Sequence, residues 1–168
     1  EIRRYPYLDE KGKILGYVVR FLQKNFLRLR NINGDDIWNW NGIKHVPYRL
    51  PQLLEANNEK KEVFLVEGEK DADNLNRLGY YSTIFLGGAG KWRNSYKKFF
   101  IESDLILMPD NDDAGIKGME RIAEHLYPVT KRLRIIYLNN ENNKSRPIRN
   151  KPSCVFCFSG RPNNFSKA

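Results

Sequence analysis

Apolar and polar positions change their spacing near residue 60 of this 168-residue chain. In the first part, apolar residues alternate with polar ones, as in strands whose two faces meet different surroundings. The alternation predicts strands at residues 14–21, 26–30 and 37–40. Asn33-Gly34 is typical of the turn in a β-hairpin. We therefore expect a small β-rich module over residues 1–60, followed near its end by a short helix that opens at Pro51.

From residue 62 onward, short apolar runs alternate with helical stripes. The runs predict strands at residues 63–66, 82–86, 105–108 and 133–138. The stripes predict helices at residues 69–78, 96–101 and 114–126. Strands that alternate with helices indicate crossover connections and a parallel sheet. The expected fold class is therefore α/β, with a Rossmann-like parallel sheet flanked by helices over residues 61–138.

Charge is unevenly distributed along the chain, whose net charge is +9. Residues 1–60 carry 11 basic and 7 acidic side chains, residues 61–127 carry 9 and 12, and residues 128–168 carry 9 and 1. An acidic middle between basic flanks suits a cation site within a surface that attracts polyanions. Residues 139–168 lack periodicity, and we expect a basic, disordered tail there.

Bulk properties narrow the setting of the protein. No apolar run approaches the length of a membrane span, and two cysteines do not indicate a disulfide scaffold, so we expect a cytoplasmic protein with no membrane partner. The chain begins at Glu1 rather than at Met, as a fragment of a longer protein would.

Acidic residues follow two of the predicted strands. Glu67 comes directly after the strand at 63–66, and Asp110 and Asp112 follow the strand at 105–108. Because parallel strands end at one edge of a sheet, these side chains can face one another, and carboxylates are the ligands that Mg²⁺ prefers. The alternative for each motif is structural, with Asp112 or Asp113 as an ordinary helix N-cap.

The two motifs, Glu67-Gly68-Glu69-Lys70-Asp71-Ala72 and Asp110-Asn111-Asp112-Asp113-Ala114-Gly115, resemble those of the TOPRIM domain. That domain occurs in bacterial-type primases, topoisomerases and some nucleases. The amino-acid sequence of these motifs is most similar to that of phage, prophage and plasmid primase–helicases. Residues 9–21 and 47–56 are also similar to the segments that precede TOPRIM in bacterial primases, so the resemblance covers about residues 5–138.

The resemblance implies a DNA primase-type nucleotidyltransferase that builds RNA primers on single-stranded DNA from nucleoside triphosphates during replication, with Mg²⁺ or Mn²⁺ as cofactor and a replicative helicase as a possible partner. It assigns catalytic and metal-binding roles to Glu67, Asp110 and Asp112, with Asp113 as an additional metal-site residue. We assign nucleic-acid or nucleotide binding to Lys13, Arg20, Lys70 and Lys91; solvated surface positions are the alternative for Lys13 and Arg20.

Two departures from the family pattern leave other functions open. The family carries a third acidic motif after its last strand, where this chain has only Glu141. It usually also carries an N-terminal zinc-binding module, which is not in this sequence. A truncated or degenerate primase, a metal-dependent TOPRIM nuclease and a non-catalytic nucleic-acid-binding remnant are the alternatives.

Two further features have an ordinary and a functional interpretation. Gly87-Gly88-Ala89-Gly90 fails the phosphate-loop spacing, so a tight turn is expected, although its amides could meet a phosphate. The aromatic residues of the first part interleave with basic ones, which suits either packing or stacking on single-stranded bases. They are Tyr5, Tyr7, Tyr17, Trp38, Trp40 and Tyr48.

Overall fold

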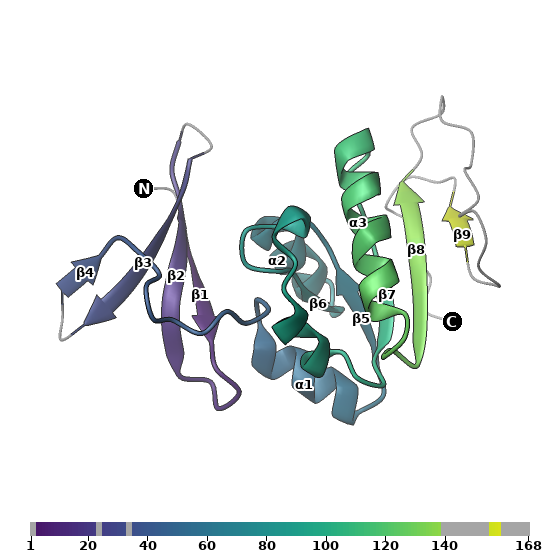
Figure 1. Ribbon diagram of the computed structural model, residues 1–168, viewed down its shortest axis with the longest axis horizontal. Coiled ribbons are helices and arrows are strands. Elements are labelled where there is room, and N and C mark those ends of the chain that lie inside the picture. Colours follow the sequence, from purple (N-terminus) through teal and green to yellow (C-terminus); the bar gives the residue numbers. More distant parts are fainter. Residues whose placement is uncertain (1–2, 23–24, 33–34, 139–154, 159–168) are drawn as a thin grey trace.

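The structure is a computed structural model that describes residues 3–22, 25–32, 35–138 and 155–158. An antiparallel sheet forms the N-terminal part (Figure 1), with strands in the order β1-β2-β3-β4. Its strands are β1 (Arg3–Leu8), β2 (Ile14–Arg20), β3 (Phe26–Ile32) and β4 (Asp35–Ile37). The hairpin turn predicted at Asn33-Gly34 lies outside the described residues.

A parallel sheet follows, with strands in the order β6-β5-β7-β8-β9. These strands are β5 (Glu62–Leu65), β6 (Tyr81–Thr83), β7 (Asp104–Leu107), β8 (Arg132–Leu138) and β9 (Val155–Phe158). The helices are α1 (Leu50–Asn58), α2 (Glu69–Arg77) and α3 (Asp113–Leu126), with 3₁₀ turns η1 (Ala89–Lys91) and η2 (Asn94–Phe99). The predicted parallel α/β sheet is thus confirmed.

One face of the parallel sheet carries the main core. Val63 of β5 pairs with Leu105 of β7, which pairs in turn with Leu133 of β8, so these three side chains share a face. Buried residues of α1 and α3 belong to the same hydrophobic cluster. Within the described residues, no helix is long and apolar enough to cross a membrane.

Aromatic side chains join the N-terminal sheet to this core. The Tyr7 ring lies 5.7 Å from Trp40 and 5.3 Å from Tyr48, measured between centroids. Gly16 permits this packing, because a Cβ there would lie 2.9 Å from the Trp40 ring. Packing is therefore the role of the buried members of the set, Tyr5, Tyr7, Trp40 and Tyr48, whereas Trp38 is 49% exposed.

The segment before α1 closes the outer edge of the parallel sheet. The Tyr48 backbone N–H donates to the Ile84 carbonyl oxygen at 2.9 Å. The Thr83 hydroxyl donates to the Tyr48 carbonyl oxygen at 2.6 Å. Strand β6 thus pairs with β5 on one side, and on the other a segment from the N-terminal part binds the Thr83 side chain and the residue that follows the strand.

Several elements differ from the sequence-based expectation. The strand predicted at residues 37–40 is β4 at Asp35–Ile37, and the strand predicted at residues 82–86 is β6, which ends at Thr83. Strand β1 was not expected, because Pro6 interrupts its pattern; β1 lies at the edge of its sheet, where a proline is tolerated. The predicted helix at 96–101 is the 3₁₀ turn η2, shifted to Asn94–Phe99. The segment expected to be a disordered tail includes strand β9, and its other residues from 139 onward lie outside the described residues.

Candidate functional site at the acidic edge of the parallel sheet

Glu67 and Asp110 meet at the carboxyl edge of the parallel sheet. Strands β5 and β7 are neighbours with Leu65 opposite Leu107, so the residues that follow them leave the sheet at the same place. The Asp110 backbone N–H donates to Glu67 Oε1 at 2.9 Å. A Cβ at Gly115 would lie only 2.4 Å from the same oxygen, so glycine at that position makes room for the Glu67 carboxylate.

Asp112 has the structural role that the sequence left open. It is the N-cap of α3, and its Oδ1 accepts a hydrogen bond from the Gly115 backbone N–H at 2.7 Å. Such a cap satisfies one of the free amides at the start of a helix. The second carboxylate oxygen has no hydrogen bond within the described residues. Asp113 is the first residue of α3 and is exposed.

The carboxylates at this edge raise one another's proton affinity. Partial burial raises the pKa of Glu67, and the negative charges of Asp110 and Asp112 raise it further, against the lowering effect of the Asp110 amide. Partial burial also raises the pKa of Asp110, with contributions from Asp71 and Asp112. Like charges held this close favour a proton or a cation.

Asp71 is a member of this acidic group that the sequence analysis did not assign. It lies in the first turn of α2, and a Cβ at Gly68 would stand 2.7 Å from its Oδ2. The sequence feature that could have indicated this is the position of Asp71, two residues into a helix that begins at the sheet edge. The acidic group of the edge therefore comprises Glu67, Asp71, Asp110 and Asp112.

The acidic edge offers oxygen ligands but not a complete set of them. Within the described part of the chain, no three His, Cys, Asp or Glu side chains are close enough together to hold a metal ion. Mg²⁺ is commonly held by one or two carboxylates, with waters and substrate phosphates completing its six positions. The donor set is entirely oxygen, which suits Mg²⁺ or Mn²⁺. Glu141, the acid of the expected third step, lies outside the described residues.

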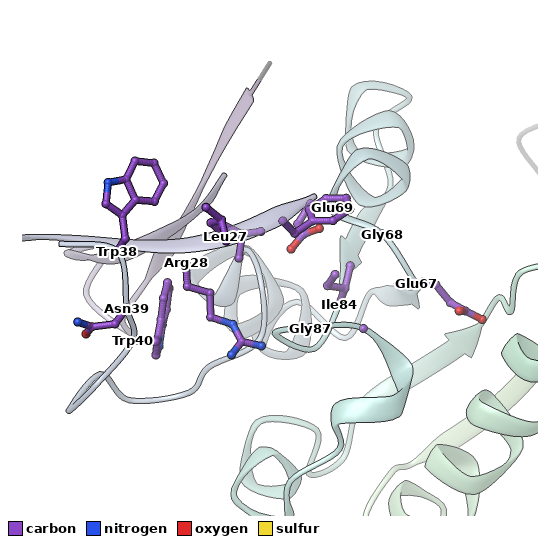
Figure 2. Close-up of a pocket in the computed structure, with 13 residues that line it drawn as sticks. Leu27, Arg28, Trp38, Asn39, Trp40, Glu67, Gly68, Glu69, Ile84 and Gly87 are labelled. Atoms are coloured by element: carbon purple, nitrogen blue, oxygen red, sulfur yellow. The ribbon is translucent and has the colours of Figure 1, made fainter. Parts of the chain in front are cut away.

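A cleft of about 670 Å³ runs from the N-terminal sheet to the acidic edge (Figure 2). Glu67, Gly68 and Glu69 line one side. Glu69 is only 7% exposed and accepts a hydrogen bond from the Tyr7 hydroxyl at 2.9 Å. Burial raises the pKa of Glu69. The remaining lining residues are Val18, Phe26, Leu27, Arg28, Trp38, Asn39, Trp40, Ile84, Gly87 and Gly88.

None of the four basic residues predicted to bind nucleic acid or nucleotide lines this cleft. Lys13 lies in the turn between β1 and β2, where its backbone N–H donates to Asp9 Oδ1. The Arg20 guanidinium lies over the Phe26 ring at 5.8 Å from the centroid. Lys70 is exposed on α2, and Lys91 packs beside the Gly87 turn. Their predicted roles remain predictions.

Arg28 is the basic residue that does line the cleft. Arg28 belongs to the alternating strand predicted at residues 26–30, and no role was predicted for it. Because the direction in which it points depends on how the two sheets meet, the local pattern does not reveal it.

Comparisons with known proteins show which proteins this chain resembles. No family model matches the chain. It is 35% identical over 72 residues to the DNA primase DnaG of Staphylothermus marinus, covering 43% of this chain and 17% of that protein. It is 30% identical over 83 residues to DnaG of Desulfurococcus amylolyticus, covering 49% and 20%. The chain thus spans no more than about a fifth of the curated relatives it matches.

Solved structures agree on the fold. The E. coli primase catalytic core matches with a TM-score of 0.61 at 22% identity, covering 83% of this chain and 45% of that one. A DnaG primase catalytic domain bound to ssDNA matches with 0.60 at 20%, covering 83% and 46%. The primase fragment of the bacteriophage T7 primase-helicase protein matches with 0.54 at 24%, covering 79% and 52%.

The chain is therefore an α/β protein with a TOPRIM-type catalytic-domain fold, as its paired acidic motifs predicted. More particularly, it has a DNA primase-like fold, that of the primase catalytic core.

Proposed function

We propose that this chain is a primase-type nucleotidyltransferase core that builds RNA primers on single-stranded DNA from nucleoside triphosphates. The observation that carries the proposal is the meeting of Glu67 and Asp110, whose pKa values are raised by partial burial and by their acidic neighbours. Carboxylates without cationic partners at a cleft are typical of functional sites. The fold shared with primase catalytic cores supports the same reaction.

In this proposal Asp110 and Asp112 bind Mg²⁺ or Mn²⁺, and Glu67 is a further ligand or an acid–base group. When bound, the ion would neutralise the triphosphate and stabilise the charge that develops during phosphoryl transfer. The Asp110 amide fixes the orientation of the Glu67 carboxylate. Gly115 and Gly68 leave the room that the Glu67 and Asp71 side chains occupy. Asp113 lies beside the group and is proposed as an outer contact.

Single-stranded DNA and nucleoside triphosphates are the proposed partners. The cleft that reaches Glu67 from the N-terminal sheet is open enough for a nucleotide or a strand. Two solved neighbours carry related partners in their descriptions: one is a primase domain bound to ssDNA, and the other is part of a primase-helicase protein. A replicative helicase is accordingly a proposed partner.

The test is a template-directed assay on the intact chain with labelled ribonucleotides and a single-stranded DNA template. Labelled primers that require Mg²⁺ or Mn²⁺ are the expected product. Cleavage of the template under the same conditions would instead indicate the nuclease alternative. Products that form equally well in the presence of a chelator would contradict both.

A second candidate function is that of a non-catalytic nucleic-acid-binding remnant. The specific observation in its favour is that the described residues do not bring three metal-ligating side chains together. Binding of single-stranded DNA that weakens steeply with salt, with neither synthesis nor cleavage, would support it. Titration of the chain with Mn²⁺ distinguishes it further, because a remnant would bind the ion no more tightly than its Glu67→Gln variant does.

A further inference from the structure

Strand β1 meets helix α2 through two polar contacts. Arg3 Nη2 donates to Asp73 Oδ2 at 2.7 Å, and the Tyr7 hydroxyl donates to Glu69 Oε1 at 2.9 Å. Arg3 and Tyr7 are four residues apart on β1, so they lie on the same face of the strand. Glu69 and Asp73 are four residues apart on α2, so they lie on one face of the helix. We call these four residues the β1–α2 contact.

The acceptors of the β1–α2 contact are shielded from water. Glu69 is 7% exposed and Asp73 is 4% exposed, and Tyr7 is fully buried. Hydrogen bonds to a charged group in such surroundings are stronger than hydrogen bonds in water. The loss of a donor would leave a buried acceptor unsatisfied, which is unfavourable. The spacing between β1 and α2 is therefore held firmly.

The other end of the N-terminal part is bound to the same helix. The Tyr48 hydroxyl and Arg49 Nε donate to Asp73 Oδ1 at 3.0 and 3.1 Å, and Arg49 Nη1 donates to Asn76 Oδ1 at 2.9 Å. Arg49 has a φ angle of 56°, which is uncommon for a residue with a side chain. Such a conformation persists where surrounding contacts enforce it. Asp73 thus holds both the first strand and the last segment of the N-terminal part.

Helix α2 also carries part of the acidic edge. Gly68 is its N-cap, Glu67 comes directly before, and Asp71 lies in its first turn. In Figure 2, Glu69 lies toward the N-terminal sheet and Glu67 toward the acidic edge. Residues of the N-terminal sheet line the other side of the cleft. The position of this sheet relative to α2 therefore determines the width of the cleft.

We propose that Glu69 and Asp73 are positioning residues that hold the cleft at the width its ligand requires. This inference rests on the proposed function and deepens it. Both act through the N-terminal sheet rather than on the reacting atoms. With the β1–α2 contact broken, only a fraction of the molecules has the required cleft width, and the apparent affinity for the ligand falls by that fraction. A saturating ligand restores the required width, so the KM for the template rises while kcat is retained.

The experiment compares Asp73→Asn and Arg3→Gln with the intact chain in primer synthesis. Asp73→Asn keeps the shape of the side chain and removes its charge. Arg3→Gln removes only the partner on β1, whose side chain is 46% exposed, so the core is left intact. Arg3→Lys is the conservative variant, because the contact is made by one nitrogen that an ammonium group can replace. The matched control is Leu126→Ala, which lowers stability from a buried position at the end of α3.

Asp73→Asn is expected to raise the KM for a single-stranded DNA template by about tenfold, which corresponds to about one tenth of the molecules with the required cleft width. Arg3→Gln is expected to raise it less, and Arg3→Lys to restore it. In all three variants kcat stays close to that of the intact chain. Leu126→Ala is expected to keep the KM of the intact chain at a temperature where circular dichroism shows that it is folded. A KM in Asp73→Asn and Arg3→Gln equal to that of Leu126→Ala would overturn the inference.

A second measurement requires no activity. Spin labels are placed at Ile14→Cys on β2 and Glu124→Cys on α3, both exposed positions, with the two natural cysteines replaced by serine. Double electron–electron resonance then gives the distribution of distances between the two sheets' labels. We expect a narrow distribution in the labelled parent and in Leu126→Ala, and a broader one when Asp73→Asn is added. An unchanged distribution in Asp73→Asn would contradict the role of the β1–α2 contact.

The two measurements separate the inference from the proposed function. If the intact chain makes no primer while Asp73→Asn broadens the distance distribution, the β1–α2 contact sets the cleft width and the proposed function is wrong. If the intact chain makes primers while Asp73→Asn changes neither the KM nor the distribution, the proposed function stands and the inference is wrong.

Discussion

Glu67 and Asp73 lie six residues apart, the first between β5 and α2 and the second within α2, and the charged groups around them have opposite signs. Asp73 is 4% exposed and accepts hydrogen bonds from the Tyr48 hydroxyl at 3.0 Å, from Arg49 Nε at 3.1 Å and from Arg3 Nη2 at 2.7 Å. Glu67 accepts one backbone N–H and has other acids as its charged neighbours. The chain has 29 basic residues, yet none in the part that the structure describes forms an ion pair with Glu67.

The difference separates carboxylates that hold the fold from carboxylates that are free to bind. Asp73 ties β1 and the start of α1 to α2, and so connects the two sheets. A buried charge needs such partners to be tolerated at all. Among the described residues the acidic edge has one backbone amide and no cation against its charge, which costs stability and is typical of ligand-binding sites.

The largest effect expected on the acidic side of this comparison follows from Asp110→Asn. Removing one charge from the edge is expected to lower primer synthesis by about a hundredfold to a thousandfold, the range seen when one electrostatic contact to a transition state is lost. Steady-state synthesis at saturating Mg²⁺ measures it. Glu124→Gln, an exposed change on α3, is the control for loss of charge. Retained synthesis in Asp110→Asn would remove Asp110 from the mechanism.

On the structural side, Asp73→Ala is expected to lower the free energy of unfolding by about 2 to 3 kcal/mol. The loss leaves Tyr48 and two arginines without their shared acceptor, and it stays moderate because Arg3 and Arg49 keep access to water. Urea unfolding measures it. The matched control is Asp71→Ala, two residues earlier on the same helix, where the acid is exposed at the edge. Equal destabilisation by both variants would contradict the distinction.

Tyr7→Phe is expected to lower the free energy of unfolding by about 1 kcal/mol, because the buried Glu69 carboxylate loses the hydrogen bond that the Tyr7 hydroxyl donates to it. Thermal unfolding followed by circular dichroism measures the change. Tyr17→Phe is the control; Tyr17 is partly exposed, and its ring lies beneath the Arg4 guanidinium. A cost no larger than that of the control would show that the Tyr7 hydroxyl does not stabilise Glu69.

Among the changes in stability, that of Glu67→Gln is expected to be the smallest, and its size depends on pH. Because the folded-state pKa of Glu67 is raised, the folded state binds its proton more tightly than the unfolded state does. The wild-type protein therefore loses stability as pH rises from the ordinary carboxyl pKa through the raised one. Without divalent cations, the variant should be more stable at neutral pH by less than about 1 kcal/mol.

That difference should disappear as pH falls below the ordinary carboxyl pKa, where both side chains are neutral. Added Mg²⁺ should stabilise the wild type and not the variant. Unfolding curves at several pH values, with and without Mg²⁺, test both statements. A variant that is less stable at neutral pH would mean that Glu67 is compensated in the folded protein.

The sequence predicted most of the parallel sheet and the common edge at which Glu67 and Asp110 lie, because both depend on local periodicity and on where strands end. Glu67 and Asp110 could be paired in advance since parallel strands share an edge. Strand β1 could not be predicted, because Pro6 obscures its alternating pattern. The proline is tolerated because β1 lies at the edge of its sheet. The N-cap role of Asp112 was visible locally as one of two alternatives.

Residues whose roles depend on how the two sheets meet were beyond the sequence. Arg28 belongs to an alternating strand, and nothing in that pattern tells which cleft it enters. Asp73 reads as an ordinary polar helix residue until Arg3, Arg49 and Tyr48 are brought to it from other elements. The four basic residues chosen from resemblance or sequence position lie outside the cleft lining, because the chain has 29 basic residues and their local pattern does not show which of them face the cleft.

The closed outer edge of the parallel sheet has a consequence for association. An outermost strand normally offers free amide and carbonyl groups that a second molecule can pair with. Beside β6, the segment at Tyr48 binds the Thr83 hydroxyl and, just beyond the strand, the Ile84 carbonyl oxygen. A second molecule that added a strand at this end of β6 would have to displace that segment, so the contacts that hold the N-terminal part in place also oppose self-assembly there.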